Sequence, residues 1–116
     1  RGCPDVTAVD AHPGCTAFIR QTAATLNLPI RAFRQDAMAY LQKDRSSYDL
    51  VLADPPYDLP EEDLRALARL CLDEQRLRPE GILVLEHRRD YDFGDLPVYD
   101  DKRVYGGTAF SLFVKE

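Results

Sequence analysis

Four consecutive residues, Asp54-Pro55-Pro56-Tyr57, have types and spacing that suit the binding of a flat base carrying an amino group. A proline lacks a backbone N–H donor and has a restricted φ, and the residue before it is kept out of the helical region. The segment therefore predicts an extended loop whose carbonyl oxygens have few internal donors. The Asp54 carboxylate and one such carbonyl would accept hydrogen bonds from an –NH₂ group, and the Tyr57 ring would stack on the base.

Three acidic residues, Asp10, Asp36 and Asp54, lie at or just after the ends of expected strands. In a parallel sheet, ligands bind in the crevice at the carboxyl ends of the strands. Asp10 at such an end suits hydrogen bonding to ribose hydroxyls. Aspartate is also common in turns and caps, and Asp36 alone is better explained as the N-cap of a short helix.

Strands and helices alternate in the pattern of apolar residues that surrounds these positions. Strands are expected at 6–10, 30–34, 48–53 and 82–86, and helices at 15–26, at 37–41 and from residue 58 onward. The run Leu50–Ala53 is typical of a strand covered on both faces. Two further strands, 98–105 and 108–114, are joined by a tight turn at Gly106-Gly107. The pattern predicts an α/β fold with a mainly parallel sheet and a C-terminal antiparallel hairpin.

Several local features refine these elements. Asp58 and Glu61 are spaced as a capping box, with Pro60 in the first turn of the helix that follows. The segment Pro79-Glu80-Gly81 is expected to be a turn before the strand 82–86. Two helical stripes are expected to be buried. They are Cys15, Phe18, Ile19, Thr22 and Leu26 in the first helix, and Leu64, Leu67, Ala68, Cys71 and Leu72 in the third.

Composition narrows the class of protein. The 116 residues are 45% hydrophobic and 30% charged, with a net charge of −5, and no apolar run is long enough to span a bilayer. The three cysteines have no metal-ligand spacing, so we expect neither a metal nor a disulfide scaffold, and a cytoplasmic location. An acidic chain is unusual for a protein that binds nucleic acid, which needs local basic patches. His87-Arg88-Arg89 and Lys102-Arg103 are the candidates.

The segment 54–57 also matches in full the signature (D/N/S)-P-P-(Y/F) of the amino-methyltransferases that act on nucleic acids. Within that group the chain resembles most the bacterial small-subunit (16S) ribosomal RNA guanine-N2 methyltransferases. The resemblance runs over nearly the whole chain. The stretches that carry it are Arg1-Gly2, Val6–Asp10, Asp36-Ala37, Val51–Tyr57, Leu85-Glu86-His87 and Tyr105–Thr108.

This resemblance implies a Rossmann-like methyltransferase fold that uses S-adenosyl-L-methionine (AdoMet). Asp10 would bind the AdoMet ribose, and Asp36 with Ala37 would contact its adenine. In the Asp54-Pro55-Pro56-Tyr57 loop, Asp54 and the Pro55 carbonyl would hold the target amino group and Tyr57 would stack on the base. Glu86 and His87 match a Glu-His pair of the family, to which we assign no chemical step. The partner would be ribosomal RNA or the small ribosomal subunit, and the protein would act as a monomer.

One departure from the family pattern keeps other interpretations open. The family's first strand and glycine-rich loop are expected upstream of Arg1, so residues 1–116 would form an N-terminally incomplete methyltransferase domain. A DNA adenine or cytosine amino-methyltransferase is one alternative, although no target-recognition domain is recognisable. A non-catalytic Rossmann-like scaffold module is the other.

Overall fold

The computed structural model describes residues 6–10, 13–27, 30–43, 46–55, 59–73 and 76–115. The chain divides into two compact units, Arg1–Asp44 and Arg45–Glu116, each of which has its own sheet. None of the helices in the described ranges is long and apolar enough to cross a bilayer.

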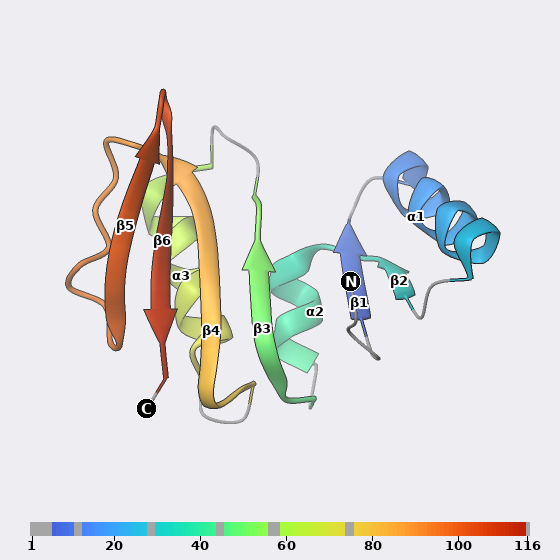
Figure 1. Ribbon diagram of the computed structural model, residues 1–116, viewed down its shortest axis with the longest axis horizontal. Coiled ribbons are helices and arrows are strands. Elements are labelled where there is room, and N and C mark those ends of the chain that lie inside the picture. Colours follow the sequence, from blue (N-terminus) through green and yellow to red (C-terminus); the bar gives the residue numbers. More distant parts are fainter. Residues whose placement is uncertain are drawn as a thin grey trace. The chain divides into compact units, whose positions relative to one another are not determined.

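The first unit has the predicted alternation of strands and helices. It contains β1 (Val6–Asp10), α1 (Pro13–Leu26), β2 (Ile30–Arg34) and α2 (Ala37–Lys43). β1 and β2 are parallel, with Val6 opposite Ile30 and Asp10 opposite Arg34 (Figure 1). Pro29, which follows the first helix in the sequence, lies outside the described residues.

The predicted buried stripe of α1 is wrong. Phe18 and Leu26 are 69% and 61% exposed, whereas Thr16 and Ala23 are buried. The reason is a polar contact that hydrophobic periodicity does not reveal. Arg20 donates from Nε and Nη2 to the carbonyl oxygen of Ala32 in β2, over 3.2 and 2.8 Å. This contact turns the face with small side chains toward the sheet, so the larger apolar residues point away from it.

The second unit is a four-stranded sheet with one helix. Its elements are β3 (Tyr48–Ala53), α3 (Glu61–Cys71), β4 (Leu77–Arg88), β5 (Tyr99–Tyr105) and β6 (Thr108–Val114). The strand order is β3-β4-β6-β5, and α3 lies behind the sheet in Figure 1. β3 and β4 are parallel, whereas β6 runs antiparallel to both β4 and β5. Parallel strands followed by a C-terminal hairpin agree with the prediction, and Gly106 in the turn has a φ of 62°.

The core of this unit lies between α3 and one face of the sheet. Every second side chain of β4 and β6 is buried there, including Leu83, Leu85, Ala109 and Phe113. The predicted stripe of α3 is confirmed at its four buried positions, Leu64, Leu67, Ala68 and Cys71. Leu72 is half-buried and forms the C-cap. Burial raises the pKa of the Cys71 thiol to about 11, which keeps it protonated and unreactive.

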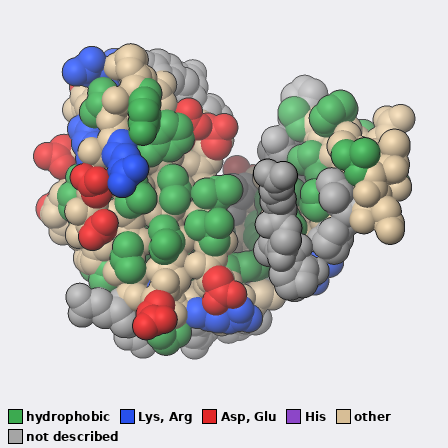
Figure 2. Space-filling view, in the orientation of Figure 1, with side chains coloured by type: hydrophobic (Ala, Val, Ile, Leu, Met, Phe, Trp, Pro, Cys, Tyr) green, Lys and Arg blue, Asp and Glu red, His purple; other side chains and the backbone are tan. Residues whose placement is uncertain are grey.

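The opposite face of the sheet is open. Leu50 and Leu52 are 53% and 72% exposed, so the expectation that β3 is covered on both faces is wrong for the described residues. Figure 2 shows hydrophobic side chains gathered on this side of the sheet. Apolar composition alone therefore did not reveal which face of β3 is covered.

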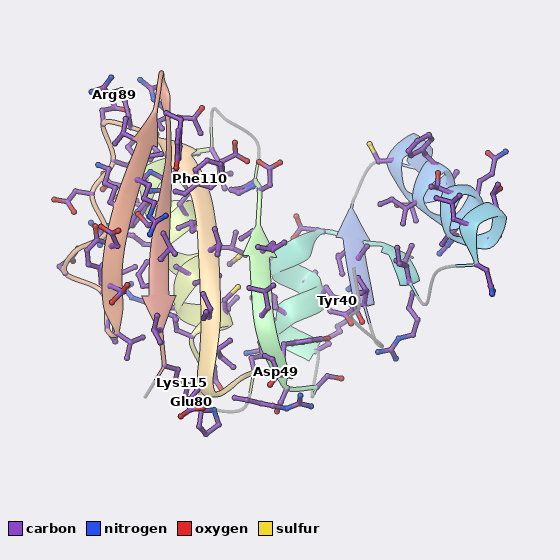
Figure 3. All side chains as sticks on the ribbon, in the orientation of Figure 1. Tyr40, Asp49, Glu80, Arg89, Phe110 and Lys115 are labelled. Atoms are coloured by element: carbon purple, nitrogen blue, oxygen red, sulfur yellow. The ribbon has the colours of Figure 1, made fainter. Side chains whose placement is uncertain are left out.

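Two local predictions in this unit are corrected. α3 begins at Glu61 with Pro60 as N-cap, whereas the predicted capping box puts Asp58 at the N-cap and Pro60 in the first turn. Asp58 itself lies outside the described residues. The expected turn at 79–81 is part of β4, which bulges there, and Glu80 has a φ of 68°. The Glu80 N–H donates to the Lys115 carbonyl oxygen over 2.7 Å, which keeps this irregular segment in the sheet (Figure 3).

Candidate active site at the carboxyl ends of the strands

Asp54 and Pro55 leave the sheet at the carboxyl end of β3, where the sequence predicts the base-binding loop. Asp54 is exposed and Pro55 is half-buried. Pro56 and Tyr57, the other two residues of the motif, lie outside the described residues. The first two residues of the motif are therefore accessible to a ligand at this end of the strand.

A network of contacts holds the segment that follows this loop. The Tyr91 hydroxyl donates to the carbonyl oxygen of Leu59 over 3.3 Å. The loop that carries Tyr91 is fixed to α3 by Arg65, which binds the Asp95 carboxylate at 2.9 Å and the Asp92 carbonyl oxygen at 2.8 Å. The segment 89–98 thus connects α3 to Leu59, the first described residue after the predicted loop.

Glu86 lies beside Asp54 at the same edge of the sheet. Ala53 is opposite Leu85 in the parallel pair, so Asp54 and Glu86 occupy the next position along the two strands. The pKa of Glu86 is raised by a hydrogen bond with the Asp54 carboxyl group, by burial and by the Asp54 charge, in that order. In the sequence, Glu86 was identified by resemblance as part of a Glu-His pair of the family, and no chemical step was assigned to it. The signal that could have found it is its position at the end of the neighbouring strand.

His87, the other member of that pair, is part of the core. Its side chain is only 4% exposed and lies edge-on to Phe93, with ring centroids 4.7 Å apart. Nδ1 lies 2.6 Å from the Arg88 carbonyl oxygen, and Nε2 lies 2.7 Å from Ser111 Oγ. Because a carbonyl can only accept, Nδ1 carries the proton and the neutral ring accepts from Ser111. His87 therefore has a structural role, and it does not contribute an exposed side chain to the expected basic patch 87–89.

This burial makes a prediction about stability and pH. Desolvation is the largest cause that lowers the pKa of His87 from its ordinary value of 6.5. The unfolded chain therefore takes up a proton near pH 6.5, whereas the folded chain does so only at lower pH. His87 costs no stability above pH 6.5 and destabilises the fold progressively as the pH falls below that value. Urea unfolding at pH 7.5 and 5.5 should show a lower midpoint at pH 5.5. His87→Asn should reduce this difference, and an unchanged difference would contradict the assignment.

The predicted basic patches are partly neutralised by neighbouring carboxylates. Arg88 binds Asp90 at 3.1 Å and Arg103 binds Asp101 at 3.4 Å. Arg89, labelled near the upper end of the sheet in Figure 3, donates to the Gly106 carbonyl oxygen over 3.1 Å. Lys102 donates to the carbonyl oxygens of Arg89 and Tyr91 over 2.9 and 2.8 Å. Carbonyl partners leave the charges of Arg89 and Lys102 in place, so this region keeps some positive charge.

The residues expected to bind AdoMet all lie in the first unit. Asp10 is the last residue of β1, and Asp36 follows β2 by two residues, so both lie at the carboxyl edge of the two parallel strands. Asp36 Oδ2 accepts a hydrogen bond from the Ala39 N–H over 3.1 Å, which confirms its role as N-cap. Ala37 is the first residue of α2. The structure thus brings these three together in one unit, and Asp54 with Pro55 in the other.

Comparisons with known proteins bear on the family and the fold of this chain. The family model described as "Conserved hypothetical protein 95" matches residues 1–114. YlbH of Bacillus subtilis (strain 168), provisionally named an rRNA methyltransferase, is 31% identical over 124 residues, which cover 99% of this chain and 66% of YlbH. This chain therefore spans slightly less than two thirds of the length of that relative.

Solved structures show the same fold. The yhhF protein of Escherichia coli, provisionally named a methyltransferase, superposes with a TM-score of 0.86 at 20% identity. The match covers 98% of this chain and 64% of that protein. TrmN of Thermus thermophilus superposes with a TM-score of 0.72 at 25% identity, over 97% of this chain and 36% of TrmN. The predicted methyltransferase fold is confirmed.

Proposed function

Because this chain belongs to the family described as "Conserved hypothetical protein 95", we propose that it transfers a methyl group from AdoMet to the exocyclic amino group of a guanine in 16S ribosomal RNA. Residues 1–116 would form one methyltransferase domain. The name of YlbH, 31% identical to this chain, supports ribosomal RNA as the substrate class. The partner would be ribosomal RNA or the small ribosomal subunit. The protein would act in the cytoplasm as a monomer.

The observation that carries this proposal is the position of Asp54-Pro55 at the carboxyl end of β3. An exposed carboxylate and a carbonyl oxygen are two acceptors for the two hydrogens of an amino group. When both hydrogens are held, the direction of the nitrogen lone pair is fixed. Orientation of this kind supplies most of the rate acceleration when the electrophile is already reactive.

The described residues of the first unit fit AdoMet as the donor. The carboxylate residues at the edge of β1 and β2 suit the acceptance of hydrogen bonds from ribose hydroxyls, as in other nucleotide-binding sheets. Asp10 would bind the ribose, and Asp36 with Ala37 would contact the adenine. When AdoMet is bound, it supplies a methyl group attached to a positively charged sulfur. The contribution of the chain is to hold the acceptor amine.

Labelled-methyl transfer from AdoMet tests the proposal, with the protein encoded by the complete open reading frame. Unmethylated small ribosomal subunits, naked ribosomal RNA and duplex DNA are offered in parallel. Label on a guanine amino group of 16S ribosomal RNA is the expected result. Label on adenine or cytosine of DNA would replace the proposal with a DNA amino-methyltransferase. The absence of both transfer and AdoMet binding would favour a scaffold module.

Tyr57→Ala is expected to reduce methyl transfer by about 10- to 100-fold, because a base that stacks on an aromatic ring gains roughly 1–3 kcal/mol. AdoMet affinity should change by less than about threefold, since the ring is proposed to contact the base and not the donor. Rates from the labelled-methyl assay and equilibrium binding of AdoMet separate the two effects. Equal losses in both would contradict the stacking role, and Tyr57→Phe serves as the control that retains the ring.

A further inference from the structure

Two carboxyl groups share the carboxyl edge of β3 and β4, and the function proposed above uses one of them. Ala53 is opposite Leu85, which places Asp54 next to Glu86 across the parallel pair. Side chains alternate between the faces of a strand. Glu86 therefore points away from the buried Leu85, to the same open face as Ile82. It is half-buried, whereas Asp54 is exposed.

Among the described residues, Asp54 is the charged group that acts on the pKa of Glu86. On β6 its opposite neighbour is Phe110, whose ring packs edge-on against Tyr105 with centroids 5.9 Å apart. Phe110 is labelled near the upper end of this sheet in Figure 3. On β4 itself, Arg88 is bound to Asp90 at 3.1 Å. From β3 the charged group that faces Glu86 is Asp54.

Two ionised carboxylates cannot hydrogen-bond to each other, so the contact between Asp54 and Glu86 requires a shared proton. That contact is the largest cause that raises the pKa of Glu86. Donors placed between or beside the oxygens of the two carboxyl groups would stabilise their ionised forms. A ligand with two adjacent N–H groups would supply two such donors.

We propose that Glu86 accepts the N1–H of the target guanine, while Asp54 and the Pro55 carbonyl hold the neighbouring amino group. This specificity role rests on the proposed function. The Watson–Crick edge of guanine presents N1–H and the amino group side by side as donors, and unstacked bases are read on that edge. Adenine and cytosine instead have a ring nitrogen lone pair beside the amino group. A second carboxylate at that position accepts from guanine and repels the other two bases.

The test compares guanine with 2-aminopurine, which keeps the amino group and lacks the N1–H. Small ribosomal subunits are reassembled with 16S ribosomal RNA carrying either base at the mapped nucleotide. Glu86→Ala should lower kcat/KM for guanine by about 10- to 100-fold, the usual effect of a lost hydrogen bond to a charged group. For 2-aminopurine, whose N1 lone pair would face the carboxylate, Glu86→Ala should not lower kcat/KM, because there is no N1–H contact to lose. Glu62→Ala, on the exposed side of α3, is the control for loss of a surface charge.

A pH profile gives a second, independent readout. Protonation removes the charge that strengthens the acceptance of N1–H by Glu86, so kcat/KM for guanine should fall as the pH drops through the raised pKa of Glu86. Glu86→Gln keeps a carbonyl acceptor but does not titrate. This variant should be more active than Glu86→Ala, and its activity should decline only at lower pH than in the wild type.

The possible outcomes separate this inference from the proposed function. Equal losses for guanine and 2-aminopurine, or no loss for guanine, would overturn the role of Glu86 while leaving guanine methylation established. An unchanged pH profile in Glu86→Gln would also overturn it. Failure of the wild-type protein to label any guanine would instead refute the proposed function.

Discussion

Replacing Asp54 by alanine should reduce methyl transfer to ribosomal RNA by about 100- to 1,000-fold, the loss typical of removing one preorganised hydrogen-bonding group from an active site. Asp54 lies at the end of β3 and is exposed, so its removal leaves no cavity and should not disturb the fold. The loss should fall on kcat more than on KM, because alanine still admits the base but no longer orients its amino nitrogen. Single-turnover transfer of labelled methyl groups measures the effect.

Asp54→Asn is the matched variant for this prediction. The family signature accepts aspartate, asparagine or serine at this position, and the asparagine side chain keeps an acceptor oxygen. The rate of methyl transfer in Asp54→Asn should therefore fall by roughly tenfold or less, well below the loss in Asp54→Ala. Thermal unfolding of all three proteins verifies that they are folded. An alanine variant within fivefold of the wild-type rate would remove Asp54 from the mechanism.

Phe113→Ala should lower the free energy of unfolding by about 3–5 kcal/mol, the range measured for buried phenylalanines in other proteins. Phe113 is 0% exposed, lies opposite Leu83 on β4 and packs edge-on against Tyr99 with centroids 5.7 Å apart. Alanine would leave a cavity between α3 and the sheet that the surrounding strands cannot close. Because whole domains are stable by only about 5–15 kcal/mol, a large share of the stability would be lost. Urea unfolding followed by circular dichroism measures the change.

Phe110→Ala provides the comparison within the same strand. Phe110 points to the open face and is half-buried, so its truncation removes less buried surface. Its effect should be less than half that of Phe113→Ala, because the cost scales with the cavity that remains. Similar losses for the two variants would show that the covered face of the sheet is not the principal core.

Much of the fold could be predicted from periodicity and turn residues. The strands 6–10, 30–34 and 48–53 and the hairpin at Gly106 follow from alternation, apolar runs and the glycine pair. The buried stripe of α3 could be predicted because that helix packs through aliphatic side chains on one face. Where the Arg20 contact with Ala32 decides the orientation, as in α1, hydrophobic spacing selected the wrong face.

The candidate site could be predicted only in part. Asp54 and Pro55 were found because their types are unusual at a strand end, whereas Glu86 was assigned no step. Its neighbour is 32 positions earlier in the chain, and only the register of β3 against β4 brings the two together. Register depends on pairing between distant segments, which the local pattern of one sequence does not record. The bulge at Glu80, where φ is positive, could not be predicted for the same reason.

The order of strands in the second unit has a consequence for how the protein folds as it is made. β6 is the last of the strands to be synthesised, yet it lies between β4 and β5. Until it leaves the ribosome, β4 has no partner on that side, and the leucines of its covered face lack Ala109 and Phe113. At roughly 5–20 residues per second, the interval between β4 and β6 lasts on the order of a second or more. A nascent chain that stalls in this interval would present an open, apolar strand edge to other chains and depend on chaperones to remain soluble.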